Sequence, residues 1–165
     1  MAALLVALAV VSCNRSDTPA AICGTRVDPA LSRPLLTATE GLHEINRVDR
    51  SDPVFAPCVV LAGHDPVMEL HFSWDGKMPD LTYLAQGAGS ISHISEPREI
   101  ELADAAVIGT DGAISSARCK TKGGSYFTLT LQLPKMKLTD QSHRTDIEKF
   151  MRAYFPATVK TLGCA

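Results

Sequence analysis

The fold is decided by residues 58–74, which read CVVLAGHDPVMELHFSW. Residues 58–62 are apolar and predict a strand, and Gly63-His64-Asp65-Pro66 predicts the turn that follows it. Residues 67–74 then alternate between apolar and polar side chains. The apolar members are Met68, Leu70, Phe72 and Trp74, and the polar members are Glu69, His71 and Ser73. Because successive side chains of a strand point to opposite faces, this stretch predicts an antiparallel hairpin with one buried face.

A second hairpin is predicted in the other half of the chain. Residues 113–121 predict a strand, residues 122–125 a Gly-Gly turn, and residues 126–133 alternate again. The side chains expected to face inward are Phe127, Leu129, Leu131 and Leu133, and those expected to face outward are Tyr126, Thr128, Thr130 and Gln132. Weaker patterns indicate strands at residues 44–48 and 105–109. The two halves together predict a mainly antiparallel sheet.

Helices are predicted near both ends of this sheet region. Asp28-Pro29 predicts the start of a short helix, because Asp is a good N-cap and Pro fits the first helical position. A longer helix is predicted to begin at Asp140, at Ser142 or at a capping box of Thr145 and Glu148. Its residues at helical spacing are Ile147, Phe150, Met151, Tyr154, Thr158 and Leu162. The expected fold class is α+β, a mainly antiparallel sheet of about five to seven strands with a short N-terminal helix and a long C-terminal amphipathic helix packed on it.

The leader of the chain indicates export. Residues 1–13 read MAALLVALAVVSC, an apolar run that ends in Ser12-Cys13. A run of about ten apolar residues is too short to span a bilayer and matches the core of a signal peptide. A small residue followed by cysteine resembles the bacterial lipobox, so we expect Cys13 to be lipidated, for example with palmitate. The alternatives are a secretory signal cut nearby without lipidation, or a buried N-terminal helix of a cytosolic protein.

This leader divides the chain into three parts. Residues 1–13 are expected to be the signal peptide, residues 14–22 a polar tether, and residues 23–165 a single domain. The chain carries 16 Lys and Arg against 18 Asp and Glu, a formal net charge of −2. That balance gives no basic footprint for nucleic acid, so nucleic-acid binding is not expected.

The cysteines predict disulfide bonds. Apart from Cys13, the chain contains Cys23, Cys58, Cys119 and Cys164. An even number of cysteines in an exported chain favours disulfides over free thiols, although four free buried thiols are the alternative. Of the three possible pairings we favour Cys23–Cys58 with Cys119–Cys164, which joins neighbours along the chain. Each such loop contributes roughly 4 kcal/mol in the chain-entropy model.

The pattern of the leader and the cysteines is similar to that of the small exported lipoproteins of actinobacteria, which are largely without an assigned function. The resemblance is carried by the leader with its cysteine, Cys23-Gly24-Thr25, Cys58 opening a strand, Cys119 before a hairpin, and Leu162-Gly163-Cys164 after the helix. It implies lipid anchoring and paired disulfides. No catalytic residue can be carried over from it.

One cluster of titratable side chains is predicted. Glu69 and His71 share the polar face of one strand, and His64 lies in the adjoining turn. An acid–base or metal site would need a further group from another strand, and polar pairs facing solvent are the alternative interpretation. The dipeptide His43-Glu44 begins a zinc-protease pattern, but Arg47 stands where its second histidine would be. We therefore expect neither a metal nor another cofactor.

Three functional hypotheses follow. The first is a membrane-anchored extracytoplasmic lipoprotein of the cell envelope, a non-enzymatic binding or accessory domain whose partner is an envelope protein or a small ligand. The alternative is a small extracellular hydrolase with a site near His64, Glu69 and His71. A third hypothesis, an inhibitor that presents residues 76–112 to a protease, predicts that these residues form a projecting and rigid loop.

Overall fold

A computed structural model describes residues 18–52, 54–87, 93–136 and 141–164. The expected signal peptide and the expected lipidation site at Cys13 lie outside the described residues. Within the described ranges, no helix is both long enough and apolar enough to cross a membrane.

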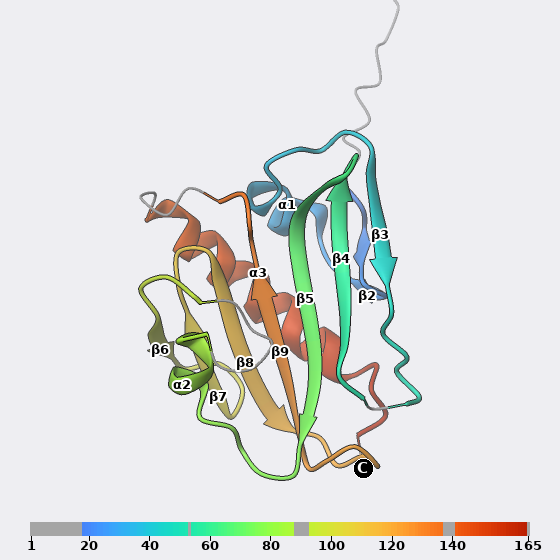
Figure 1. The fold of residues 1–165 in the computed structure, drawn as a ribbon, viewed down its shortest axis with the longest axis vertical. Coiled ribbons are helices and arrows are strands. Elements are labelled where there is room, and N and C mark those ends of the chain that lie inside the picture. Colours follow the sequence, from blue (N-terminus) through green and yellow to red (C-terminus); the bar gives the residue numbers. More distant parts are fainter. Residues whose placement is uncertain (1–17, 53, 88–92, 137–140, 165) are drawn as a thin grey trace, which may run out of the picture.

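The domain is built on a seven-stranded antiparallel sheet (Figure 1). In spatial order the strands are β3 (Leu42–Asn46), β4 (Ala56–Ala62), β5 (Asp65–Asp75), β9 (Tyr126–Gln132), β8 (Gly112–Arg118), β7 (Ala105–Ile108) and β6 (Arg98–Ile100). Two meanders, β3 to β5 and β6 to β9, therefore meet where β5 pairs with β9. The α+β class and the antiparallel sheet are confirmed.

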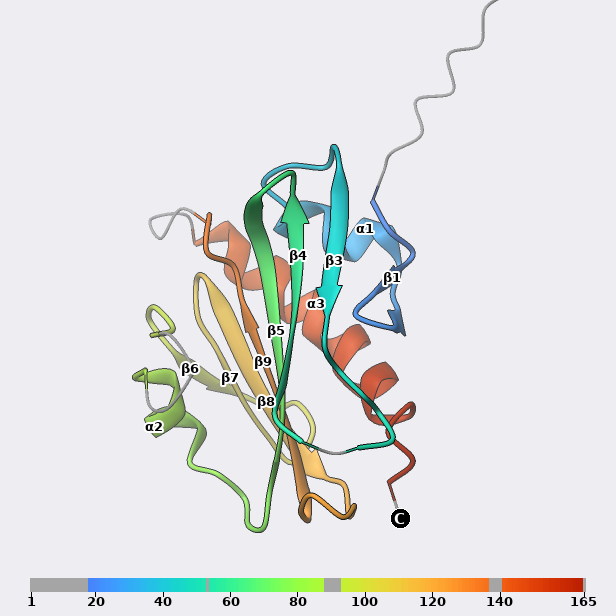
Figure 2. The same ribbon diagram turned by 45° about the vertical axis from the view of Figure 1, so that its right-hand side comes forward.

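The C-terminal helix α3 (Ser142–Val159) crosses one side of this sheet, which we call the back face (Figures 1 and 2). The apolar sides of the two predicted hairpins meet there in register, with Leu70 opposite Leu131 and Phe72 opposite Leu129. The helix buries Ile147, Phe150, Met151, Tyr154, Phe155 and Thr158 against them. The predicted C-terminal helix is thus confirmed.

The helix begins earlier than a capping box would place it. Its N-cap is Gln141, which makes no side-chain capping bond, and Ser142 is its first residue. Thr145 and Glu148 therefore lie inside the helix, and their interpretation as a capping box is wrong. Contacts along the buried stripe of the helix stabilise it without a cap.

The N-terminal segment packs on the same side. A two-stranded hairpin, β1 (Ala21–Ile22) and β2 (Thr25–Arg26), is followed by the one-turn helix α1 (Pro29–Ser32) and the 3-10 turn η1 (Arg33–Leu35). The carboxylate of Asp28 accepts a hydrogen bond from the Ala30 amide at 2.9 Å. Thr18 and Ile22 are buried. Residues 18–22 thus belong to the domain, and their assignment to the tether is wrong.

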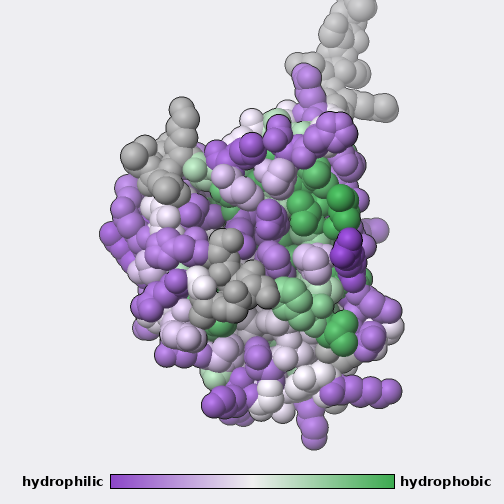
Figure 3. All heavy atoms as spheres, viewed as in Figure 1, coloured by the Kyte–Doolittle hydropathy of each residue, from purple (hydrophilic) through white to green (hydrophobic). Residues whose placement is uncertain are grey.

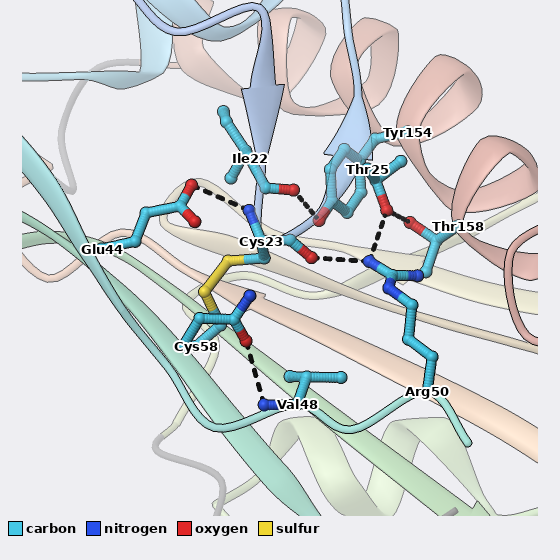
Figure 4. Close-up of a disulfide and its surroundings, with 10 residues drawn as sticks. Ile22, Cys23, Thr25, Glu44, Val48, Arg50, Cys58, Tyr154 and Thr158 are labelled. Carbon is cyan, nitrogen blue, oxygen red and sulfur yellow. Dashed lines mark hydrogen bonds between the residues drawn. A yellow bond between two sulfur atoms is a disulfide. The ribbon is translucent and has the colours of Figure 1, made fainter. Parts of the chain in front are cut away.

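Two disulfides join these parts, in the pairing that the sequence favours. Cys23, in the turn of the β1–β2 hairpin, is bonded to Cys58 of β4 (Figure 4). Cys119, just after β8, is bonded to Cys164, which follows α3. One disulfide therefore fixes the N-terminal hairpin to the sheet, and the other fixes the chain end beyond the helix.

The opposite side of the sheet, the front face, differs from the prediction. Thr128, Thr130 and Gln132 of β9 were expected to face outward, but all are buried. The short helix α2 (Leu81–Ala85) packs over this side of β7 and β8, where it forms a second apolar cluster. Residues 76–112 therefore contribute a helix and two strands to the domain, and the prediction of a projecting loop is wrong.

Candidate functional site

The front face carries two rows of side chains where β3, β4, β5 and β9 lie side by side. Residues that pair directly in antiparallel strands have their side chains on the same face. The first row is Ile45, Val59, Glu69 and Gln132, and the second is Pro57, His71 and Thr130. The first row is thus apolar on β3 and β4 and polar on β5 and β9, and the second is apolar on β4 and polar on β5 and β9.

His71 stands at the border between the apolar and polar halves. Its side chain is 13% exposed, and its Nε2 atom lies 3.5 Å from Glu69 Oε2. The imidazole also stacks on the ring of Phe55, with ring centroids 5.8 Å apart. Both ring nitrogens are buried, and in the described part of the chain neither has a hydrogen-bond partner. A buried polar group without a partner costs about 1–3 kcal/mol, which a bound molecule or water would offset.

A cavity of about 170 Å³ opens at the polar end of the first row. Its lining residues are Glu69, His93, Asp111, Gln132, Leu133 and Pro134. The carboxylate of Asp111 accepts bonds from the Ser95 amide at 2.7 Å and the Ser95 hydroxyl at 2.8 Å, which fixes the wall of the cavity. Glu69 and Asp111 make this cavity acidic, so it favours a ligand group that is cationic or donates hydrogen bonds.

An apolar surface adjoins the polar groups. Ile45, Val54 and Phe55 are 50%, 53% and 49% exposed, unusually high values for large apolar side chains. Hydrophobic residues gather over β3 and β4 on the front face, on the right of Figure 3. Exposed apolar side chains that form a contiguous patch can serve as an interaction surface. We call these three residues, together with Glu69, His71 and the cavity, the front-face site.

Of the three residues predicted from the sequence, the structure brings two together. Glu69 and His71 are in contact, but His64 is exposed in the turn before β5. From Asp65, at the start of that strand, to His71 the rise is about 20 Å. His64 therefore contributes nothing to the front-face site.

Sequence reasoning missed three residues of this site. In the sequence, Asp111 is recognisable only as part of an Asp-Gly turn with Gly112. Gln132 is predicted to face outward, and no sequence pattern singles out His93. The strand pairing of β5 with β9 and the packing of residues 93–95 bring them together. Neither feature has a local signal in the sequence.

One group of potential metal ligands occurs in the described ranges. Cys23, Glu44 and Cys58 place a ligand atom each within 4.8 Å of one another. The two sulfur atoms are bonded to each other, and the Glu44 carboxylate accepts a hydrogen bond from the Cys23 amide at 2.8 Å (Figure 4). These atoms form a structural joint, and the thiolates that a metal requires are not present.

Comparisons with known proteins assign no family to the chain. No family model matches it, and no curated protein or solved structure matches it significantly.

Proposed function

We propose that this protein is exported and lipid-anchored at the cell envelope, where its domain binds a small ligand at the front-face site. The leader that ends at Cys13 supports the anchor, and the resemblance to actinobacterial lipoproteins agrees with it. The two disulfides support an extracytoplasmic location, because disulfides persist in oxidising compartments and are rare in the cytosol.

The buried imidazole of His71 carries the binding part of the proposal. Folding desolvates two ring nitrogens here and gives them no hydrogen-bond partner in the described part of the chain, although Glu69 Oε2 lies 3.5 Å from Nε2. One nitrogen of a neutral imidazole donates a hydrogen bond and the other accepts one. A ligand that offers both an acceptor and a donor recovers the cost of that desolvation on binding.

The surroundings of His71 define the class of ligand. Glu69 and the acidic cavity face one end of the site, while Phe55 and Ile45 form the other. A complementary molecule is amphipathic, with a cationic or hydrogen-bond-donating group at Glu69 and an apolar body against β3 and β4. Sites of this kind combine apolar walls with a few polar groups that fix orientation.

The hydrolase alternative is less well supported. General acid–base catalysis requires groups within hydrogen-bond reach of one reacting centre. Because His64 lies in the turn of the hairpin, only Glu69 and His71 remain of the three residues that the hydrolase hypothesis names. Binding is therefore the function that this geometry favours.

Metabolic labelling tests the lipid anchor. Cells that produce the wild-type chain or Cys13→Ser are grown with radiolabelled palmitate and separated into membrane and soluble fractions. We expect label and membrane association for the wild type, and neither for Cys13→Ser. A wild-type protein that carries no label and stays soluble would exclude the anchor.

Co-purification tests the front-face site. Small molecules that remain bound to the purified full chain are identified by mass spectrometry, for the wild type, Glu69→Gln and Tyr83→Ala. Tyr83 is the control, because it is exposed on α2 away from the two rows. Loss of a charged hydrogen bond should reduce retention by about tenfold or more in Glu69→Gln alone. Equal retention in all three proteins, or a co-purifying protein in place of a small molecule, would reject this ligand class.

A further inference from the structure

A second cavity lies at the end of the molecule that carries the C-terminus. It has a volume of about 520 Å³ and is formed by the loop after β3, the β8–β9 turn and the turn after α3. Its lining residues are Arg50, Ser51, Thr121, Lys122, Thr161, Leu162 and Gly163. In Figure 1 these segments lie at the lower end, whereas the described chain begins at the upper end. We call it the basic cavity.

The charges of the basic cavity are unbalanced. Its lining includes the cations Arg50 and Lys122, and no carboxylate is found among the described residues that line it. Neither cation has a carboxylate within ion-pair distance in the described ranges. Asp49 is adjacent in the sequence, but it accepts hydrogen bonds from the amide and the hydroxyl of Ser51. The cavity therefore has an excess of positive charge in a protein whose net charge is −2.

The guanidinium of Arg50 is held in place by neutral groups (Figure 4). Its Nη2 atom donates to the Cys23 carbonyl at 2.6 Å and to Thr25 Oγ1 at 2.9 Å, and Nη1 donates to Thr161 Oγ1. Its charged end also lies 5.5 Å from the centre of the Phe72 ring. Burial lowers the pKa of Arg50, although arginine stays protonated in proteins. The structure thus partly desolvates a fixed cation, and none of the described residues forms an ion pair with it.

Several donors remain for a ligand. The guanidinium has five N–H groups. The single N–H of Nε and one of the two on Nη1 are not used in the hydrogen bonds above. The Thr121 hydroxyl accepts a bond from the Gly123 amide at 3.2 Å, which leaves its own hydrogen free to donate. The hydroxyl of Thr161 is already used, because it donates to the Thr158 carbonyl at 2.6 Å. Arg50, Thr121 and Lys122 are therefore the lining residues that still have donors for a ligand.

We propose that the basic cavity binds the phosphate group of a small soluble molecule. A phosphate monoester carries close to two negative charges at neutral pH and so matches the two cations. The volume lies within the usual range of about 300–1,000 Å³ for small-molecule sites. The choice of a soluble phosphate over a lipid headgroup rests on the proposed lipid anchor. That anchor would attach the protein to the membrane through the segment before the described chain, and the cavity is at the far end of the domain from the start of the described chain.

An NMR titration of the full chain with inorganic phosphate at constant ionic strength tests this site. A parallel titration with sodium chloride shows which chemical-shift changes any anion produces. We expect saturable shifts for residues 50–51, 121–122 and 161–163 and a Kd in the low millimolar range. Lys122→Glu should weaken binding by about tenfold or more, because it places a carboxylate beside Arg50. The matched control is Lys135→Glu, which makes the same change of charge at the opposite end beside Asp65, and it should bind like the wild type. Shifts that do not saturate, that chloride reproduces, or that Lys122→Glu leaves unchanged would overturn the proposal.

A vesicle arm separates the two sources of phosphate. The Cys13→Ser chain is mixed with vesicles of phosphatidylglycerol or of phosphatidylcholine and sedimented. We expect no sedimentation with either lipid while free phosphate still binds. Sedimentation with phosphatidylglycerol that Lys122→Glu abolishes would overturn the choice of a soluble ligand. Failure of the phosphate titration leaves the lipid anchor and the front-face site untouched, because neither Cys13 nor Glu69 takes part in it.

Discussion

The two faces of the sheet differ in how they are closed. The back face is covered by α3 and the N-terminal hairpin, and both disulfides attach elements on that side to the sheet. The front face is covered by α2 only over β7 and β8, and it leaves large apolar side chains exposed beside β4. This difference indicates that the back face supplies most of the stability, whereas the front face is where we propose that a ligand binds.

The neighbouring strands β5 and β9 show the same contrast on a smaller scale. Both alternate apolar and polar side chains, and both bury the apolar set under α3. The polar set of β5 is partly exposed, but that of β9 is buried. The alternation of a strand therefore does not by itself determine whether its polar face meets water.

Removal of a disulfide should have the largest effect on the back face. The bonds close loops with sequence separations of 35 and 45 residues. Cys23→Ala/Cys58→Ala and Cys119→Ala/Cys164→Ala should each lower the free energy of unfolding by about 2–4 kcal/mol, measured by urea denaturation. The wild type under reducing conditions serves as the control and should lose stability as well. A loss below about 1 kcal/mol for both variants would show that the disulfides do not hold the back face together.

Tyr154 tests a buried hydrogen bond of the back face. Its hydroxyl donates to the Ile22 carbonyl at 2.8 Å, so Tyr154→Phe should cost about 1–3 kcal/mol. Burial raises the pKa of Tyr154 to about 12 from its ordinary value of 10.0. The unfolded chain therefore releases this proton at lower pH than the folded protein does, and stability falls as pH rises through this window.

Urea denaturation at pH 9 and pH 11 measures that effect. Relative to Tyr154→Phe, the wild type should lose about 1 kcal/mol of unfolding free energy between these two pH values. Tyr154→Phe is the control for the wild type, because every other titratable group is the same in both proteins. An equal loss in both proteins would mean that Tyr154 is accessible to water in the folded state.

A smaller effect is expected from the polar sides of β5 and β9. Thr128 and Ser73 pair directly, but Thr128 is buried and its hydroxyl donates to Ser116 Oγ at 3.1 Å. Thr128→Val should cost about 1 kcal/mol, whereas Ser73→Val should change stability by less than about 0.5 kcal/mol. Equal effects in thermal or urea unfolding would remove the distinction between the central strand and its neighbour.

The sequence predicts the back face better than the front face. The alternation around Phe72 and Leu129 and the helical spacing around Phe150 identify the surfaces that α3 and the sheet bury against each other. These are local patterns with periods of 2.0 and 3.6 residues, so they can be recognised without knowledge of the fold. The cysteine pairing also follows from neighbourhood along the chain.

The front-face site depends on contacts between distant segments. Glu69 and His71 share a strand and could be paired from the sequence, but His93 and Asp111 join the site through a loop and a strand pairing far away in the chain. The basic cavity likewise draws Arg50, Lys122 and Thr161 from three separate loops. Loops have no period, and therefore such sites have no local signal.

The neighbours His71 and Phe72 provide the most direct test of the division between the two faces, because they are consecutive residues of β5 that point to opposite sides. Phe72 is fully buried on the back face against Phe127, whereas the buried ring nitrogens of His71 have no hydrogen-bond partner in the described structure. Urea denaturation of the oxidised protein compares Phe72→Ala with His71→Ala. We expect Phe72→Ala to lose about 3–5 kcal/mol and His71→Ala to lose less than about 1 kcal/mol. A loss for His71→Ala as large as that for Phe72→Ala would contradict the assignment of most of the stability to the back face.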